Sequence, residues 1–165
     1  MVATPSETFG HVKSKQIAYQ VLAAAITRAG LPLYALPDGV TVGIAEDRCY
    51  EPAALVAALP QPSANSLEIA NPVIVVEVLS PSPSSARRDL TTKVAGYALV
   101  ASIQHYLLID RGERLVFRYR RVGELLAAPQ APAEGALRLD PPGFDVAVSD
   151  LLGSEASSQS AFHLM

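Results

Sequence analysis

The sequence predicts one α/β (α+β) domain in which helices flank a central mixed β-sheet. Residues 9–29 place apolar side chains at helical spacing, and residues 73–79 form a nearly pure aliphatic run. After this run, helical and strand patterns alternate along the chain, as expected where helices pack on a mixed sheet. The chain has 165 residues, which is enough for one hydrophobic core, and it contains no internal repeat.

The helix predicted at residues 9–29 carries an apolar stripe that includes Ala18, Leu22 and Ile26. Gly30 and Pro32 follow it and are typical of a helix end. The many alanines of this helix predict close packing against a flat surface such as a sheet. The next predicted elements are a turn at residues 36–39, a strand at 40–45 and its hairpin partner at 49–58.

The aliphatic run at residues 73–79 predicts a strand that is buried on both faces. Serine and proline residues at 80–85 interrupt the pattern, and a serine there would be a suitable N-cap for a second helix. The remaining predicted elements are a helix at residues 86–101 and strands at 104–110, 114–121, 135–139 and 144–148.

One carboxylate, Glu77, lies in the middle of the aliphatic strand. Burying a carboxylate is costly unless a cation, a hydrogen-bond network or a proton compensates it. Groups of this kind are common at metal sites and catalytic sites. A structural role, as a buried glutamate paired with an arginine or hydrogen-bonded near a strand end, explains the residue equally well, so the residues alone leave both interpretations open.

A metal-dependent phosphodiesterase needs two or three oxygen ligands around Mg²⁺ or Mn²⁺. Glu51 and Asp47 lie on or near the preceding strand and are candidates to join Glu77. Lys93, on the helix after Glu77, could orient the attacking water. His11 is a candidate ligand or base, although a polar residue at a helix start is the simpler interpretation.

The composition, charge and motifs of the chain argue against several classes of function. A net charge of −3 argues against strong non-specific DNA binding, unless the basic residues cluster locally. They do cluster between Arg111 and Arg121, where a solvated strand face is the alternative interpretation. The single cysteine, Cys49, excludes an intramolecular disulfide and fits a reducing cytoplasm. No glycine-rich nucleotide-binding motif, signal peptide or membrane-spanning apolar stretch is present.

Three motifs together resemble a known family. They are Pro72-x-x-Val-Val-Glu77-Val-Leu-Ser-Pro-Ser82, then Asp89-x-x-x-Lys93-x-x-x-Tyr97, then Gln104-His-Tyr-Leu-Leu-Ile-Asp110. This pattern resembles the Uma-type restriction endonucleases of the PD-(D/E)XK nuclease superfamily. The similarity extends over residues 3–152, which implies one restriction-endonuclease-like domain. The small and polar residues at the C-terminal end predict a flexible tail at 153–165.

The resemblance implies roles for individual residues. Glu77 would be a catalytic metal ligand, and Lys93 would position water and phosphate. Asp89, Tyr97 and His11 match supporting positions. The implied cofactor is Mg²⁺ (or Mn²⁺), the implied partner is DNA, and Arg114, Arg118 and Arg120 are candidate contacts to its backbone.

The chain departs from the family pattern at Ala53. Members carry an aspartate after the proline that corresponds to Pro52, and alanine cannot bind a metal. Three explanations compete: a degenerate relative that does not cleave, substitution by Glu51 on the same strand face, or a deliberate alteration. We take the first as the leading explanation.

The resulting expectation is a cytoplasmic, bacterial, metal-dependent DNA endonuclease that is impaired at Ala53 and forms a homodimer. The alternative is a non-catalytic module that binds DNA or protein and retains the nuclease fold. Metal binding near Glu77 separates the two possibilities.

Overall fold

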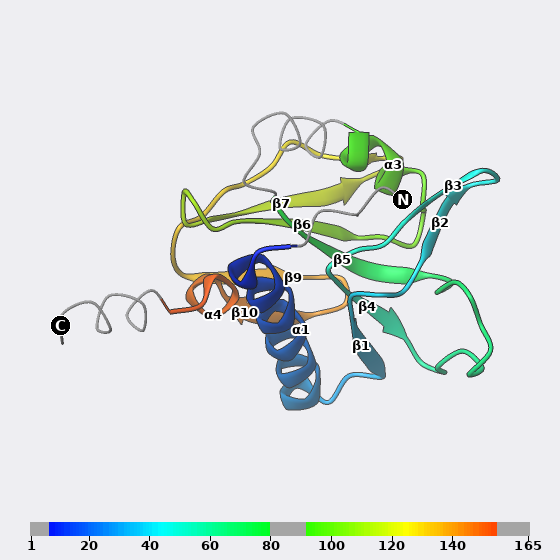
Figure 1. The fold of residues 1–165 in the computed structure, drawn as a ribbon, viewed down its shortest axis with the longest axis horizontal. Helices are drawn as coiled ribbons and strands as arrows, with labels where there is room; N and C mark the ends of the chain where they lie inside the picture. The colour runs from blue at the N-terminus through cyan, green and yellow to red at the C-terminus, as the bar shows by residue number, and fades with distance from the viewer. Residues whose placement is uncertain (1–6, 80–91, 155–165) are drawn as a thin grey trace, which may run out of the picture.

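The computed structural model describes residues 7–79 and 92–154, and Figure 1 shows their arrangement. A six-stranded sheet forms the centre, with strand order β1-β4-β5-β6-β7-β8. Only β5 and β6 run parallel within it, so the sheet is mixed. Its strands are β1 (Leu33–Pro37), β4 (Ala54–Ala58), β5 (Pro72–Val78), β6 (His105–Asp110), β7 (Leu115–Val122) and β8 (Leu125–Leu126).

Helices and hairpins cover both faces of this sheet. One face packs against α1 (Phe9–Ala29), the hairpin of β9 (Ala136–Leu139) and β10 (Phe144–Ala147), and α4 (Val148–Leu152). The other face packs against α3 (Val94–Ala98) and the hairpin of β2 (Val42–Ala45) and β3 (Arg48–Tyr50). The predicted fold class is therefore confirmed.

Helix α1 coincides with its predicted range. Thr8 caps its start, since the Thr8 hydroxyl accepts a hydrogen bond from the His11 backbone N–H at 3.2 Å. Gly30 ends the helix with φ of 66°, a left-handed conformation that favours glycine. Ala18, Ala25 and other small buried residues of α1 allow the close approach to the sheet.

Two predictions about the first strands are wrong. Residues 49–58 do not form one hairpin partner: β3 pairs with β2, whereas β4 lies between β1 and β5 in the central sheet. Pro52 separates them, because it lacks the N–H that a continuous ladder needs. The turn predicted at residues 36–39 begins inside a strand, β1, which the prediction missed.

Later elements agree more closely with the prediction. The strands predicted at residues 73–79, 104–110 and 114–121 correspond to β5, β6 and β7. Of the helix predicted at 86–101, the described part contains α3, which is only five residues long. Asp89 and residues 155–165 of the predicted tail lie outside the described residues.

His105, at the start of β6, is fully buried between the sheet and the loop before β10. Its Nε2–H donates to the Pro141 carbonyl at 2.8 Å. Burial lowers the pKa of His105 to about 4, an effect that this hydrogen bond opposes and the nearby Arg118 and Arg120 reinforce. His105 therefore stays neutral in the folded protein at neutral pH.

Acidification should destabilise the fold through His105. Between about pH 6.5 and pH 4 the unfolded chain takes up a proton on this residue that the folded chain does not, so stability is full above this window and falls within it. We expect a loss on the order of 3 kcal/mol from this group. Urea denaturation from pH 7 to pH 4 measures it, with His105→Gln as the matched control. An equal pH slope in both proteins would contradict the prediction.

Candidate functional site

A cavity of about 190 Å³ opens near the end of β5, where Glu77 lies. The first turns of α1, the segment before β4 and the turn before α3 complete its walls. Polar and charged side chains dominate the lining, which consists of Glu7, His11, Lys15, Glu51, Ala53, Glu77, Val78 and Lys93. The structure thus brings together four of the predicted site residues, Glu77, Lys93, Glu51 and His11, and places Ala53 beside them.

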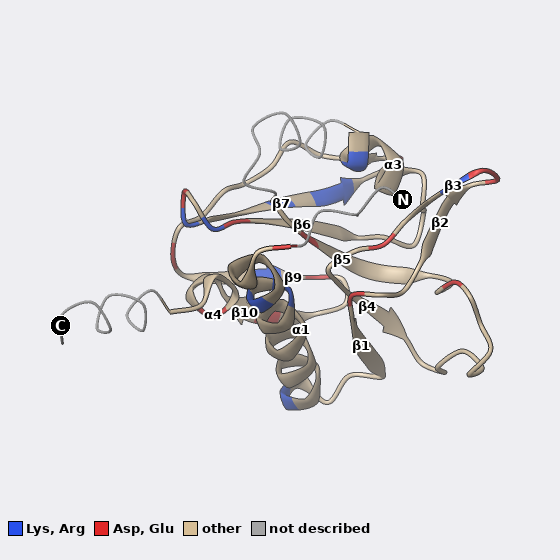
Figure 2. Ribbon diagram, viewed as in Figure 1, with Lys and Arg blue, Asp and Glu red and all other residues tan. Residues whose placement is uncertain are grey.

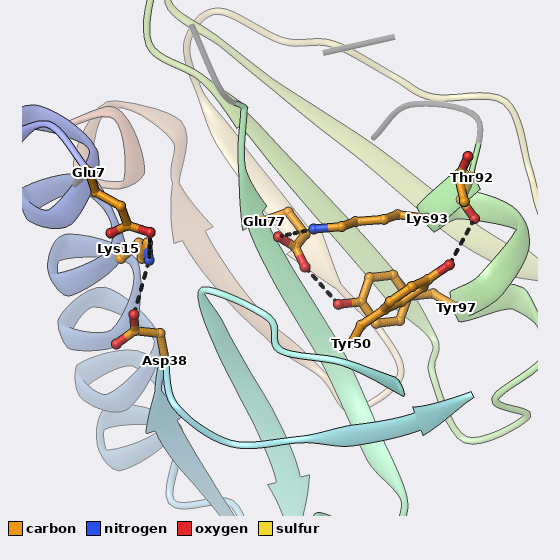
Figure 3. A network of polar contacts seen from close by, with 8 residues as sticks. All are labelled: Glu7, Lys15, Asp38, Tyr50, Glu77, Thr92, Lys93 and Tyr97. Atoms are coloured by element: carbon orange, nitrogen blue, oxygen red, sulfur yellow. Dashed lines mark hydrogen bonds and ion pairs between the residues drawn. The ribbon is translucent and has the colours of Figure 1, made fainter. Parts of the chain in front are cut away.

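Two side chains of the α3 region hold the Glu77 carboxylate (Figure 3). The Lys93 ammonium donates to Oε2 at 2.9 Å, and the Tyr97 hydroxyl donates to Oε1 at 2.7 Å. Glu77 is only 6% exposed, so these contacts offset a large desolvation cost. Burial, and secondarily the charge of Glu77, raise the pKa of Tyr97 above its ordinary range, so Tyr97 remains a neutral hydrogen-bond donor.

The β2–β3 hairpin closes one side of this network through Tyr50. The Tyr50 hydroxyl donates to the Thr92 carbonyl at 3.4 Å, and its ring meets the Tyr97 ring edge-on, with centroids 5.2 Å apart. The Lys93 ammonium lies 5.9 Å from the Tyr50 centroid, within cation–π range. Gly96 makes this approach possible, because a side chain at position 96 would overlap the Tyr50 ring. The hairpin therefore helps to fix Lys93.

A second lysine, Lys15, faces the same cavity from α1 and was missed by sequence reasoning. It contacts Glu7 at 2.5 Å and Asp38 at 3.0 Å (Figure 3). Burial lowers the pKa of Lys15, but the hydrogen bonds and charges of the two acids outweigh this effect, and the net pKa is raised. Its spacing of four residues from His11 was the available signal, since such pairs share a helix face.

The described residues do not fit a complete magnesium shell. No group of three histidine, cysteine, aspartate or glutamate side chains in residues 7–79 and 92–154 lies close enough to hold a metal. Both Glu77 oxygens already accept hydrogen bonds, and Ala53 contributes only a methyl group to the cavity wall. Asp47 lies in the β2–β3 turn and does not line the cavity. The oxygen donors present are of the right type, but their arrangement falls short of the coordination that Mg²⁺ requires.

The predicted DNA-contacting arginines lie on or beside β7, and none of them lines this cavity. Part of β7 is coloured for basic residues in Figure 2. All three donate to backbone carbonyls. Arg114 reaches the carbonyls of Leu152 and Gly153 at 3.1 and 2.9 Å, Arg118 reaches that of Arg138 at 2.7 Å, and Arg120 reaches that of Asp140 at 3.3 Å. These contacts tie β7 to the C-terminal elements, and contact with DNA stays a prediction.

Arg121, also on β7, donates hydrogen bonds to several backbone carbonyls. It donates to the carbonyls of Ala98, Val100 and Ile103 at 3.0, 2.9 and 2.5 Å, which satisfies the end of α3 and the segment after it. We expect Arg121→Met to lower the free energy of unfolding by about 2 kcal/mol, because three carbonyls in partly buried positions lose a charged donor. Chemical denaturation measures the change. Arg120→Met, which removes one longer bond, is the control, and equal losses in the two variants would argue against the role of Arg121.

Comparison with known proteins agrees with this architecture. The Uma2 family model, described as "Putative restriction endonuclease", matches residues 1–149. A similar solved structure is that of "a putative nuclease belonging to DUF820 from Anabaena variabilis ATCC 29413", with a TM-score of 0.67 and 16% sequence identity. The match covers 92% of this chain and 84% of that one. A comparison with curated proteins gives no match. No helix in the described residues is both long and apolar enough to span a membrane.

Proposed function

This chain belongs to the Uma2 family, and from that premise we propose that it acts on DNA at the Glu77 cavity. The proposed reaction is hydrolysis of a phosphodiester bond with Mg²⁺ (or Mn²⁺), impaired in this chain by Ala53. The observation that carries the proposal is the convergence of Glu77, Lys93 and Lys15 with Glu51 in one cavity.

The two lysines suit a phosphate ligand. Lys93 and Lys15 approach the cavity from opposite sides, and each is held in place by acidic partners. Ammonium groups fixed in this way can bind phosphate oxygens and offset the negative charge that develops during hydrolysis. His11 lines the same wall and is a candidate to accept or donate a proton there.

The impaired cleavage follows from the small number of oxygen ligands that the cavity offers to a metal. A divalent ion would supply charge neutralisation and an activated water. It would compete with Lys93 and Tyr97 for the Glu77 oxygens, and Ala53 offers it no ligand. Glu51 is the proposed substitute, and weak metal affinity with slow cleavage is the expected outcome.

Plasmid nicking in millimolar Mg²⁺ or Mn²⁺ tests the proposal. We expect slow nicking by the wild-type chain and at least about tenfold less by Glu77→Gln, which keeps the side-chain shape and removes the charge. Glu113→Gln, an exposed change outside the cavity, should match the wild type. Equal rates for the wild type and Glu77→Gln would contradict the proposal, because the nicking would then come from elsewhere.

A second candidate function is DNA or protein binding without cleavage. It is favoured by the Glu77 carboxylate, because both of its oxygens accept hydrogen bonds from Lys93 and Tyr97, and a metal would have to compete with these. Duplex binding in EDTA, followed by fluorescence anisotropy at low salt, tests it. Binding without metal, together with no nicking by any variant at Ala53, would support the binding module.

We also propose that the protein is a homodimer that works in the bacterial cytoplasm. Leu99, Val122 and Leu125 are largely exposed and belong to or adjoin α3, β7 and β8. Exposed apolar side chains of this kind are suitable for a subunit contact. Light scattering after size-exclusion chromatography should give twice the chain mass, and a monomer at high micromolar concentration would exclude the dimer.

A further inference from the structure

A second, larger cavity lies beside the first turns of α1 and shares no lining residue with the Glu77 cavity. Its volume is about 560 Å³, within the range of sites for small molecules, roughly 300–1,000 Å³. Residues of α1, the β6–β7 turn and the end of α4 form its walls. His11 and Lys15 face the Glu77 cavity, whereas Gly10, Lys13 and Ser14 face this one, so α1 separates the two sites.

The charged side chains that the described residues contribute to the cavity wall are all positive. Lys13, Arg111 and Arg114 line it, and no aspartate or glutamate of residues 7–79 and 92–154 does. Arg114 is fixed by its bonds to the Leu152 and Gly153 carbonyls. The Arg111 guanidinium lies directly against Gly10, where any side chain would overlap it. Within the described residues, neither Lys13 nor Arg111 has a carboxylate partner, so their charge is available to a ligand.

Two buried polar atoms at this wall point independently to a missing partner. Ser14 is 3% exposed, and its hydroxyl has no hydrogen-bond partner in the described part of the chain. The Nε–H of Arg111 is likewise buried without a partner there. Leaving such groups unsatisfied costs about 1–3 kcal/mol each. Because both can donate, the group that would satisfy them is an acceptor, and the surrounding cations favour an anionic oxygen.

Apolar side chains also line the cavity. Ile17 and Leu152 line the cavity, and Phe9 contributes a ring that is 82% exposed. An exposed aromatic ring beside cationic groups is the arrangement on which a nucleobase stacks while its phosphate is held.

We propose that this cavity binds a nucleoside 5′-phosphate, either as a free mononucleotide or as the terminal nucleotide of a single DNA strand. Lys13, Arg111 and the Ser14 hydroxyl hold the phosphate. Phe9 and Ile17 contact the base. The inference goes beyond the proposed function and does not depend on cleavage at Glu77.

Calorimetry with the full chain tests the site. The probes are thymidine 5′-monophosphate, thymidine, inorganic phosphate and a 5′-phosphorylated oligothymidine. We expect the monophosphate to bind at least about tenfold more tightly than thymidine, because thymidine lacks the charged contacts. Stronger binding of the phosphorylated oligomer identifies the strand terminus as the ligand, and stronger binding of the monophosphate identifies the free nucleotide.

Substitutions in the cavity wall test whether the monophosphate binds there. Lys13→Met and Arg111→Met should each weaken the monophosphate about tenfold. Phe9→Ala should weaken the monophosphate while leaving inorganic phosphate unchanged. Arg28→Met, at the far end of the same helix, is the matched control and should bind like the wild type. Glu77→Gln should also bind the monophosphate like the wild type. Binding at this cavity would therefore still be observed if the proposed cleavage at Glu77 were absent, and the two proposals can fail separately.

Three outcomes would overturn the proposal. The first is equal affinity for thymidine and its monophosphate. The second is binding that Lys13→Met and Arg28→Met reduce by the same factor. The third is no binding of any probe at millimolar concentration by a wild-type chain that remains folded by circular dichroism.

Discussion

Replacing Ala53 with aspartate should create Mg²⁺-dependent DNA nicking at least about a hundred times faster than that of the wild-type chain. Ala53 lines the same cavity as Glu77, and its backbone N–H donates to the carbonyl of Val76, the residue immediately before Glu77, at 2.8 Å. A carboxylate at position 53 would therefore lie beside Glu77. Two acids together with Glu51 would approach the oxygen set that Mg²⁺ requires.

The control for this gain separates charge from size. Ala53→Asn adds nearly the same volume without a negative charge, and we expect it to remain as slow as the wild type. The double variant Ala53→Asp with Glu77→Gln should lose the gain. Calorimetry should show clearly tighter Mg²⁺ binding by Ala53→Asp than by Ala53→Asn, which should bind the ion as weakly as the wild type. Metal binding without nicking would refute the account in which one lost ligand explains the impairment.

The sequence predicted the chemical centre of the site better than its surroundings. Glu77 stands out within the aliphatic run of residues 73–79, because a carboxylate is rare in a buried strand. Lys93 and Tyr97 came from the family spacing, and the structure places both on the Glu77 oxygens. Whether these residues catalyse a reaction stays a prediction.

Lys15 could not be identified in the same way. Its position in the cavity depends on how α1 crosses the sheet and on the turn that carries Asp38. These are long-range features, which side-chain spacing within one helix does not encode. The local signal, a lysine one turn after His11, is common on exposed helix faces.

The prediction of the strands was limited by a similar ambiguity. Residues 49–58 form a nearly continuous apolar segment after Tyr50, so their pattern alone does not show that β3 and β4 belong to different sheets. Pro52 marks the break, and Ala54, Leu55, Val56 and Ala57 are fully buried as expected for an inner strand. The alternation of arginines with apolar residues along β7 was predicted, but the carbonyl partners of these arginines lie in α4, in β9 and in the segment after β9, which are distant in sequence.

Lys93→Met should be among the most destabilising single changes in the protein. The substitution keeps much of the apolar stem and removes the cation 2.9 Å from Glu77, whose side chain is 8% exposed. Breaking a buried ion pair by removing one partner costs roughly 3–5 kcal/mol, because the remaining charge stays desolvated. Lys93 itself is partly solvated, with its side chain 25% exposed, so we expect about 3 kcal/mol from urea denaturation at pH 7.

The pH dependence and a second variant identify the cause of that loss. Without Lys93, protonation of Glu77 removes the buried charge, so the folded chain takes up a proton that the unfolded chain does not. The stability deficit of Lys93→Met should therefore shrink as the pH falls from 7 toward 5. Adding Glu77→Gln to Lys93→Met should recover more than half of the loss, because a neutral amide keeps the Tyr97 hydroxyl hydrogen-bonded at lower desolvation cost. A deficit that is constant with pH and unaffected by Glu77→Gln would assign the loss to packing of the Lys93 stem against Tyr50 instead.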